Sequence, residues 1–321
     1  MRGITYRQPI TAGRGVCRLL VLLCSIGLPG CDAPGTSNDT GPAYEIEALG
    51  DGLHVFRLGS RQSIFLVGSD GVIATDPLNT QAAKLYREAI AEITNLPVKY
   101  VVYSNSFFDH VAGGESLAGP GTEFIAHENC AANLRVTPRA DIVPPTQTYE
   151  DRYEVSAGDV GLTLYYFGPS YGNCLSVMIA RPANIMYVSK LVTPPVARVP
   201  DDPTLGNYYL HNIVSFYQAV EALAAEQAVD QVVGAFAPES TGTDGGTAAV
   251  PILAPVALIA EQRRMWETLL DIARIEYEQK TPARVMQSST DFERLAPYAG
   301  YDPQQVGIMM RRVYSLYRIG R

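Results

Sequence analysis

The first half of the chain shows short runs of β-branched and aromatic residues separated by turn residues. Runs of this kind are typical of β-strands, and they predict strands at residues 44–48, 53–58, 63–67, 72–75, 98–103 and 123–126. After the fourth run, apolar residues recur at helical spacing, which predicts a helix from Asn79 or Thr80 to just before Pro97. A short helix is expected near 127–134, and polar loops are expected at 104–114 and 138–147.

The second half repeats this order of elements. The same patterns predict strands at 148–155, 162–167, 175–180, 185–188 and 231–234, and helices at 210–225, 258–278 and 303–317. A Gly- and Thr-rich loop is expected at 240–248. Strands followed by a helix, twice over, favour an α/β (α+β) fold, an αββα sandwich of two mixed β-sheets flanked by helices. We expect residues 44–321 to form a single domain with a C-terminal helical extension from about 250.

The first 31 residues carry four arginines and no acidic residue, followed by an apolar run at 19–28 and then Pro29-Gly30-Cys31. This order indicates a secretory signal, too short to span a bilayer as a mature helix. Its end resembles a bacterial lipobox, which implies lipidation of Cys31 and a membrane-anchored lipoprotein of the cell envelope that faces the periplasm or the exterior. Ordinary signal cleavage and an uncleaved anchor remain alternatives. Residues 32–43 have the composition of a flexible tether.

Charge and cysteine content narrow the choice of partners. The chain has 25 basic and 33 acidic residues, and removal of the four leader arginines leaves 21 against 33, a net charge of −12. This acidity argues against a nucleic-acid partner, and membrane contact would come through the lipid on Cys31. Outside the segment up to Cys31, the remaining cysteines are Cys130 and Cys174. Export permits a disulfide between them, and two unpaired thiols are equally compatible with the sequence.

The predicted strand at 98–103 is followed by a loop that contains Asp109-His110 and then Gly113-Gly114. This segment resembles the Thr-His-x-His-x-Asp-His-x-x-Gly-Gly signature of the metallo-β-lactamase superfamily. Further landmarks follow in the family's order, at Asp76, 124–128, 168–171, 188–191 and 233–237. The resemblance covers roughly residues 44–240. It implies a sandwich of the metallo-β-lactamase type and a hydrolase with two zinc ions.

Most of the family's ligand positions hold other residues in this chain. Asp109 and His110 are kept, whereas the other five positions hold Asn105, Phe107, Tyr171, Lys190 and Phe236. Zinc needs imidazole, carboxylate or thiolate donors, a phenyl ring has no lone pair to give, and a lysine adds a cation. The chain has only four histidines, His54, His110, His127 and His211. We therefore expect no metal cofactor, with Asp109 and His110 as vestiges of the zinc site.

Several hypotheses for the altered site remain open. We expect the Lys190 ammonium within about 6 Å of Asp109, in part of the vacated charge site. Phe107 and Phe236 could simply have become packing residues. The cleft could instead bind a ligand through Asn105, Tyr171 and Asn173. A weak single-metal site at Asp109 and His110, helped by Asn105 or Tyr171, is a third hypothesis. A serine nucleophile, Ser104, Ser106 or Ser189 with Lys190 and Tyr171, is a fourth.

Together these features predict an exported lipoprotein with a metallo-β-lactamase-like fold that binds a small-molecule ligand or an envelope protein without metal. On this view the chain is a pseudoenzyme. The alternative is a hydrolase of ester, lactam or lactone substrates with a non-standard or mononuclear site, for which Asp109, His110, Lys190 and Tyr171 are the catalytic candidates. We expect His127 to cap or pack near its helix, and Met265 and Trp266 to belong to the core.

Overall fold

The first β-sheet supplies the loops that begin the site. The computed structural model describes residues 44–237, 251–282 and 290–320, and its larger sheet has seven strands in the order β1-β2-β3-β4-β5-β6-β7. The strands are β1 (Glu45–Gly50), β2 (Leu53–Leu58), β3 (Arg61–Val67), β4 (Val72–Thr75), β5 (Val98–Val102), β6 (Glu123–His127) and β7 (Gln147–Tyr149). Strands β1 to β4 pair antiparallel, and β4 to β7 pair parallel. The carboxyl ends of β4 and β5 therefore lie at one edge.

The second sheet has six strands in the order β13-β12-β11-β10-β9-β8. They are β8 (Arg152–Ala157), β9 (Val160–Tyr166), β10 (Ser176–Arg181), β11 (Ile185–Val188), β12 (Gln231–Gly234) and β13 (Leu253–Pro255). Only β11 and β12 pair parallel in this sheet. The segments that follow these two strands thus leave the sheet side by side.

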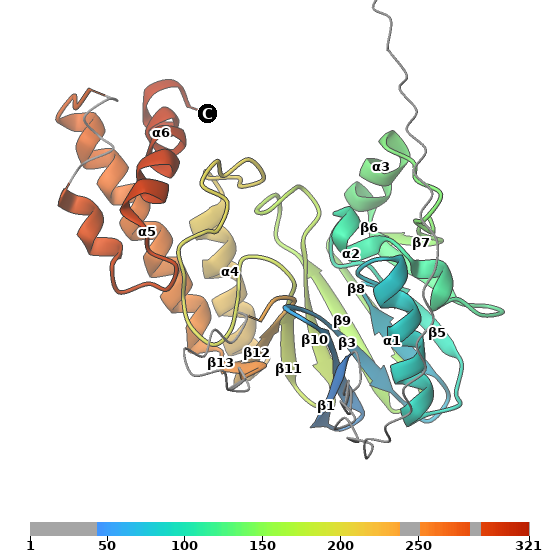
Figure 1. Ribbon diagram of the computed structural model, residues 1–321. Helices are drawn as coiled ribbons and strands as arrows, with labels where there is room; N and C mark the ends of the chain where they lie inside the picture. The colour runs from blue at the N-terminus through green and yellow to red at the C-terminus, as the bar shows by residue number, and fades with distance from the viewer. Residues whose placement is uncertain (1–43, 238–250, 283–289, 321) are drawn as a thin grey trace, which may run out of the picture. The chain divides into compact units, whose positions relative to one another are not determined.

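The two sheets face each other and are covered by helices on their outer sides (Figure 1). One buried cluster joins side chains from both sheets, including Ile64 and Leu66 of β3 and Leu162 and Leu164 of β9. A second cluster packs α1 (Thr80–Ile93) and α3 (Glu128–Val136) on the first sheet. A third packs α4 (Ile213–Glu226), α5 (Ala257–Glu278) and α6 (Pro303–Ile319) on and beyond the second. The predicted αββα sandwich is confirmed.

Local sequence signals explain where helices begin. The Asn79 carboxamide oxygen accepts hydrogen bonds from the backbone N–H groups of Gln81 and Ala82, which caps α1 as its sequence predicts. The His127 ring accepts one from the Asn129 N–H, so this histidine caps α3 as expected. Met265 and Trp266 are buried in the core. No helix in the described residues is both long enough and apolar enough to cross a membrane.

Five local features differ from the sequence-based expectation. The strand predicted at 148–155 is two strands, β7 and β8, with a break at 150–151 where the chain passes from one sheet to the other. The predicted polar loop contains a one-turn helix, α2 (Phe108–Val111), and a 3-10 turn, η1 (Gly114–Ser116). Strand β13 and a second 3-10 segment, η3 (Thr290–Leu295), were not predicted. Residues 1–43 and the loop expected at 240–248 lie outside the described residues.

Candidate functional site

The site lies where the carboxyl ends of four strands from the two sheets converge. Asp76 follows β4, and Ser104 and Asn105 follow β5. From the second sheet, Lys190 follows β11 and Phe236 follows β12. Helix α2 adds Asp109 and His110. The family resemblance singles out positions far apart in the sequence, and the topology brings Asp109, His110, Lys190 and Phe236 together.

Asp76 is the buried centre of the polar network. Its carboxylate accepts hydrogen bonds from the Ser104 backbone N–H at 2.8 Å and the Ser104 hydroxyl at 2.5 Å, and from the Tyr187 hydroxyl at 3.2 Å. The His110 Nδ1 lies 3.2 Å from the same carboxylate. The Asp76 side chain is fully buried, and its φ of 26° lies in the left-handed region that residues other than glycine seldom adopt. Its hydrogen bonds offset the cost of burying a carboxylate.

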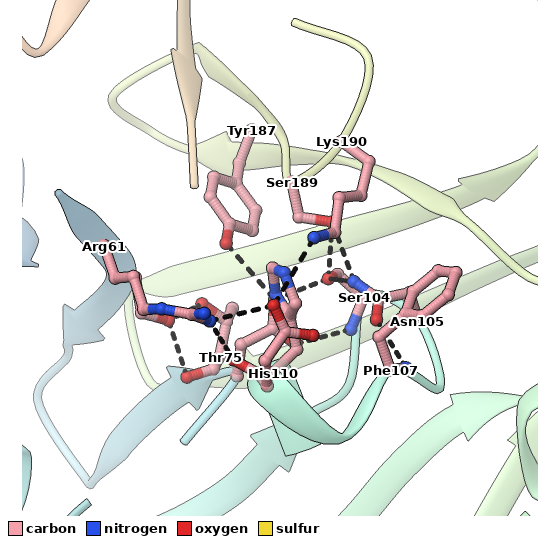
Figure 2. A network of polar contacts seen from close by, with 12 residues as sticks. Arg61, Thr75, Ser104, Asn105, Phe107, His110, Tyr187, Ser189 and Lys190 are labelled. Carbon is pink, nitrogen blue, oxygen red and sulfur yellow. Dashed lines mark hydrogen bonds and ion pairs between the residues drawn. The ribbon is translucent and has the colours of Figure 1, made fainter. Parts of the chain in front are cut away.

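Ser104, Ser189 and Asn105 extend this network inside the protein (Figure 2). The two hydroxyl oxygens are 2.6 Å apart, and the Asn105 Nδ2 donates to both, at 2.9 and 3.2 Å. The Asn105 Oδ1 accepts from the Phe107 backbone N–H at 2.8 Å. Because Ser104 and Ser189 are fully buried and their hydroxyls are engaged, neither is placed as a nucleophile toward solvent. Ser106 accepts a hydrogen bond from Asn133 and is not part of this network.

Lys190 lies among three aromatic rings, Phe107, Tyr171 and Phe236, which we call the Lys190 cage. Its Nζ is 4.4 Å from the centroid of the Phe236 ring, 5.5 Å from Phe107 and 5.6 Å from Tyr171. Rings at these distances attract a cation through their negative faces. The same Nζ is 3.7 Å from the Asp109 carboxylate, so the predicted proximity of the two groups is confirmed. Burial lowers the pKa of the Lys190 ammonium and Arg61 adds to this, while Asp109 acts in the opposite direction.

Arg61 belongs to the site although the sequence did not predict it, and the same is true of Tyr187 in the buried network and of Arg198 and Tyr208 in the neighbouring cavity. The Arg61 guanidinium donates to the Asp109 carboxylate and to the Asp109 backbone carbonyl, both at 2.9 Å. It also lies 5.6 Å from the centroid of the Phe236 ring. In Figure 2, Arg61 and Lys190 extend into the network from opposite sides. Two cations, Arg61 and Lys190, therefore flank the Asp109 carboxylate.

The charges around Asp109 predict a dependence of stability on pH. Burial alone would raise the pKa of Asp109, but His110, Lys190 and Arg61 outweigh it, and the pKa falls below its usual 3.8. A carboxyl group with a lowered pKa in the folded state stabilises the fold above pH 3.8, and this contribution is lost as the pH falls toward the lowered value. Urea midpoints across this range should fall less steeply for Asp109→Asn than for the wild type. Equal slopes in the two proteins would contradict this assignment.

A cavity of about 600 Å³ lies directly beside the Lys190 cage. Tyr171, Lys190 and Phe236 line it, together with Tyr208, Arg198 and the acidic pair Asp201 and Asp202. The Tyr171 and Tyr208 rings meet edge to face with centroids 4.8 Å apart. This volume is within the usual range for small-molecule sites.

Of the three residues predicted to contact a ligand, the structure brings only Tyr171 to this cavity. Asn105 is used in the buried network. The Asn173 carboxamide oxygen accepts from Asn133 of α3 at 2.6 Å, and its backbone carbonyl accepts from the Tyr166 hydroxyl at 2.7 Å. Sequence position placed these amides near the cleft but could not say which way each one pointed.

A disulfide fixes the segment that carries Tyr171. Cys130 of α3 is bonded to Cys174, which precedes β10, with the two Cα atoms 5.3 Å apart. The structure thus selects the disulfide from the two states that the sequence left open. Tyr171 lies three residues before Cys174, so the crosslink ties the segment that carries Tyr171 to α3.

The fold resembles that of solved metallo-β-lactamases. The metallo-β-lactamase from Pontibacter korlensis shares 14 % identity at a TM-score of 0.58, covering 70 % of this chain and 99 % of that one. DIM-1 metallo-β-lactamase exposed to ceftazidime gives 14 % identity and a TM-score of 0.55, with 71 % and 98 % covered. A second DIM-1 structure gives 13 % and 0.54 over the same shares. No family profile and no curated protein matches the chain. The chain therefore has the metallo-β-lactamase fold.

The residues at this site do not fit the zinc that the fold implies. Asp109 already has two cationic partners, and the Lys190 ammonium would repel a metal ion beside it. The His110 Nδ1 is engaged with Asp76, and its buried Nε2 has no hydrogen-bond partner within the part of the chain that the structure describes, an arrangement that would suit a single zinc ligand. One imidazole beside a carboxylate that already has cationic partners falls short of the three protein ligands that a zinc site needs. The described residues contain no group of three or more histidine, cysteine, aspartate or glutamate side chains able to hold a metal ion. His54 and His211 contact Gly52 and Gly320, not the site.

Proposed function

We propose that this protein is a metal-independent, small-molecule-binding pseudoenzyme with the metallo-β-lactamase fold, and that its ligand occupies the cavity beside Lys190. The observation that carries this proposal is the position of the Lys190 ammonium. It stands at a family metal-ligand position, is held by Asp109 and three aromatic rings, and lines a cavity of about 600 Å³. A site that had merely lost its metal would not need a cation in its place.

The alternative that the aromatic replacements are only packing residues explains the site less well. Phe107 and Phe236 are partly exposed, in contrast to the fully buried rings of the core such as Phe56 and Phe65. Phe236 and Lys190 both line the cavity. Aromatic walls with a few placed polar groups are the usual composition of a ligand site, which supports binding over simple filling.

Ligand screening with and without chelator tests this proposal. We expect some members of a small-molecule library to raise the melting temperature equally with and without EDTA. Tyr171→Ala should abolish this stabilisation, because Tyr171 forms a wall of the cavity. Tyr277→Ala is a matched control, since Tyr277 of α5 packs against Tyr314 and Tyr317 instead. Ligands that EDTA displaces, or that bind Tyr171→Ala unchanged, would overturn the proposal.

A hydrolase is the second candidate, and one observation favours it. Asp76 orients the His110 ring through Nδ1, the geometry in which a histidine can serve as a general base at Nε2. The buried position of His110 weighs against this role, because a base must reach the proton that it removes. A hydrolase should turn over esters, lactams or lactones, and Asp109→Ala and Lys190→Ala should each abolish the turnover. Absence of turnover across this panel would exclude these substrate classes.

We also propose that the chain is an exported lipoprotein anchored to the cell envelope through Cys31. The proposal rests on the leader sequence at residues 1–31 and its lipobox-like end. We expect Cys31→Ala to move the protein from the membrane fraction to the soluble fraction of the producing bacterium. Mass spectrometry of the membrane-bound wild type should find the mature N-terminus at Cys31 with acyl chains attached. An unmodified Cys31 in that fraction would contradict the lipid anchor.

A further inference from the structure

The Lys190 ammonium has donors that the protein does not use. An ammonium carries three N–H donors, yet no hydrogen bond of 3.5 Å or less joins Lys190 to another residue in the described ranges, and its ion pair with Asp109 is 3.7 Å long. The Asp109 carboxylate takes its short hydrogen bond from Arg61. The other nearby carboxylate, Asp76, has four donors of its own. Lys190 therefore presents an incompletely paired cation to the cavity.

From this arrangement we propose that the cavity binds a small monocarboxylate with an apolar or aromatic body. The carboxylate would accept hydrogen bonds from the Lys190 ammonium, and the body would pack against Tyr171, Tyr208 and Phe236. This inference rests on the proposed small-molecule function and specifies its ligand class. A charged hydrogen bond in a largely water-excluded position is stronger than one in water, which makes a side chain only 12 % exposed an effective anion receptor.

The other charges of the cavity favour one negative charge over several. Arg198, the second cation of the lining, is paired with Asp201 at 3.0 Å. Asp202 adds a further carboxylate to the same wall. A phosphate ester or nucleotide would bring two or more negative charges toward this pair with only Lys190 left to receive them. A monocarboxylate brings a single negative charge to Lys190 and therefore meets less of this repulsion.

The aromatic lining defines the rest of the ligand. Tyr171 and Tyr208 meet edge to face, and Phe236 lines the cavity and also contacts His110, with the two ring centroids 5.7 Å apart. Such rings give contact area and ring-to-ring attraction to an apolar or aromatic body. A short hydrophilic acid such as acetate would reach Lys190 but leave these walls unused, so affinity should rise with the size of the apolar body.

A matched set of three probes tests the ligand class. We would measure binding of 3-phenylpropanoate, its uncharged amide 3-phenylpropanamide and the cation 2-phenylethylamine by calorimetry or by chemical-shift changes. We expect the acid to bind the wild type at least about tenfold more tightly than the amide, and the amine to bind most weakly. Lys190→Met, which keeps an unbranched side chain one atom shorter and removes the charge, should reduce affinity for the acid about tenfold and leave affinity for the amide unchanged.

Lys99→Met is the matched control. It removes the same charge from a surface pair with Asp70, 2.7 Å long, and should leave the acid's affinity unchanged. Lys190→Arg keeps the charge and should keep the preference for acid over amide. If Lys190→Met does not fold, the preference of the wild type for the acid over the amide still tests the proposal.

Equal affinity for acid and amide in the wild type, or an acid affinity unchanged in Lys190→Met, would overturn the carboxylate class. So would failure of all three probes to bind. None of these results would by itself end the broader proposal, because screening with Tyr171→Ala and EDTA tests small-molecule binding separately. A wild type that binds no member of the library would remove both proposals.

Discussion

Replacement of Asp76 by asparagine should lower the free energy of unfolding by about 3 to 5 kcal/mol, the usual cost of breaking a buried charged network at one member. The Asp76 carboxylate receives donors from Ser104, His110 and Tyr187. An amide at this position offers one oxygen and turns an NH₂ group toward donors that need an acceptor, which leaves buried polar groups unpaired. Urea denaturation followed by circular dichroism would measure the change.

The matched control for this prediction is Asp70→Asn. Asp70 is paired with Lys99 at the surface, where an ion pair contributes at most about 1 kcal/mol. An Asp76→Asn variant as stable as Asp70→Asn would show that Asp76 does not anchor the convergence of the two sheets. The same result would weaken the account of how His110 is oriented.

Removal of the disulfide should have an effect of similar size. The bond between Cys130 and Cys174 closes a loop with a sequence separation of 44 residues, and the chain-entropy relation gives about 4 kcal/mol for a loop of this length. We expect the double variant Cys130→Ala/Cys174→Ala to lose about this much stability in urea denaturation.

Reductant provides the internal control for the disulfide. It should destabilise the wild type and leave the double variant unaffected, because that variant has no crosslink to break. Reductant can reach the disulfide once the chain is unfolded. If the wild-type unfolding curve still did not respond to reductant, a stabilising role for the disulfide would be contradicted. Loss of cavity ligands on reduction would further connect the crosslink to the position of Tyr171.

Much of the fold could be predicted because the apolar pattern of each strand follows its burial. Strands β2, β4, β11 and β12 were predicted at the residues where they occur. The break between β7 and β8 could not be predicted, since both segments carry strand-forming residues and only the tertiary fold assigns them to different sheets. Helix α2 was missed because its single turn is too short to show a helical period.

The candidate site could be predicted in part, where the family's landmarks marked positions. Those landmarks predict that Lys190 lies near Asp109, and the 3.7 Å ion pair confirms it. Arg61 carries no such mark. It is 48 residues from Asp109 in sequence, and it reaches the site because it forms an isolated bridge with Phe236 at the meeting of the two sheets. The directions of the Asn105 and Asn173 side chains could not be predicted, because their hydrogen-bond partners, Ser189 and Asn133, are distant in sequence and come close only in the folded chain.

The positive charge where the strand ends converge belongs to side chains. The two cations are Lys190 and Arg61, which lie where strands of the two sheets end. Asp109 holds both, and the aromatic replacements surround Lys190 instead of ligating an ion. Phe107, Tyr171 and Phe236 thus form one cage around the cation Lys190.

Zinc content and zinc response of the purified wild-type protein test this account most directly. The protein should be produced in zinc-supplemented medium, purified without chelator and analysed for metals, then titrated with zinc while its melting temperature is followed. We predict far less than one zinc ion per chain and an unchanged melting temperature. If the folded protein did bind zinc, a free zinc concentration 100 times the dissociation constant would stabilise the fold by about 2.7 kcal/mol. Near-stoichiometric zinc that is lost in both His110→Ala and Asp109→Asn would contradict the account.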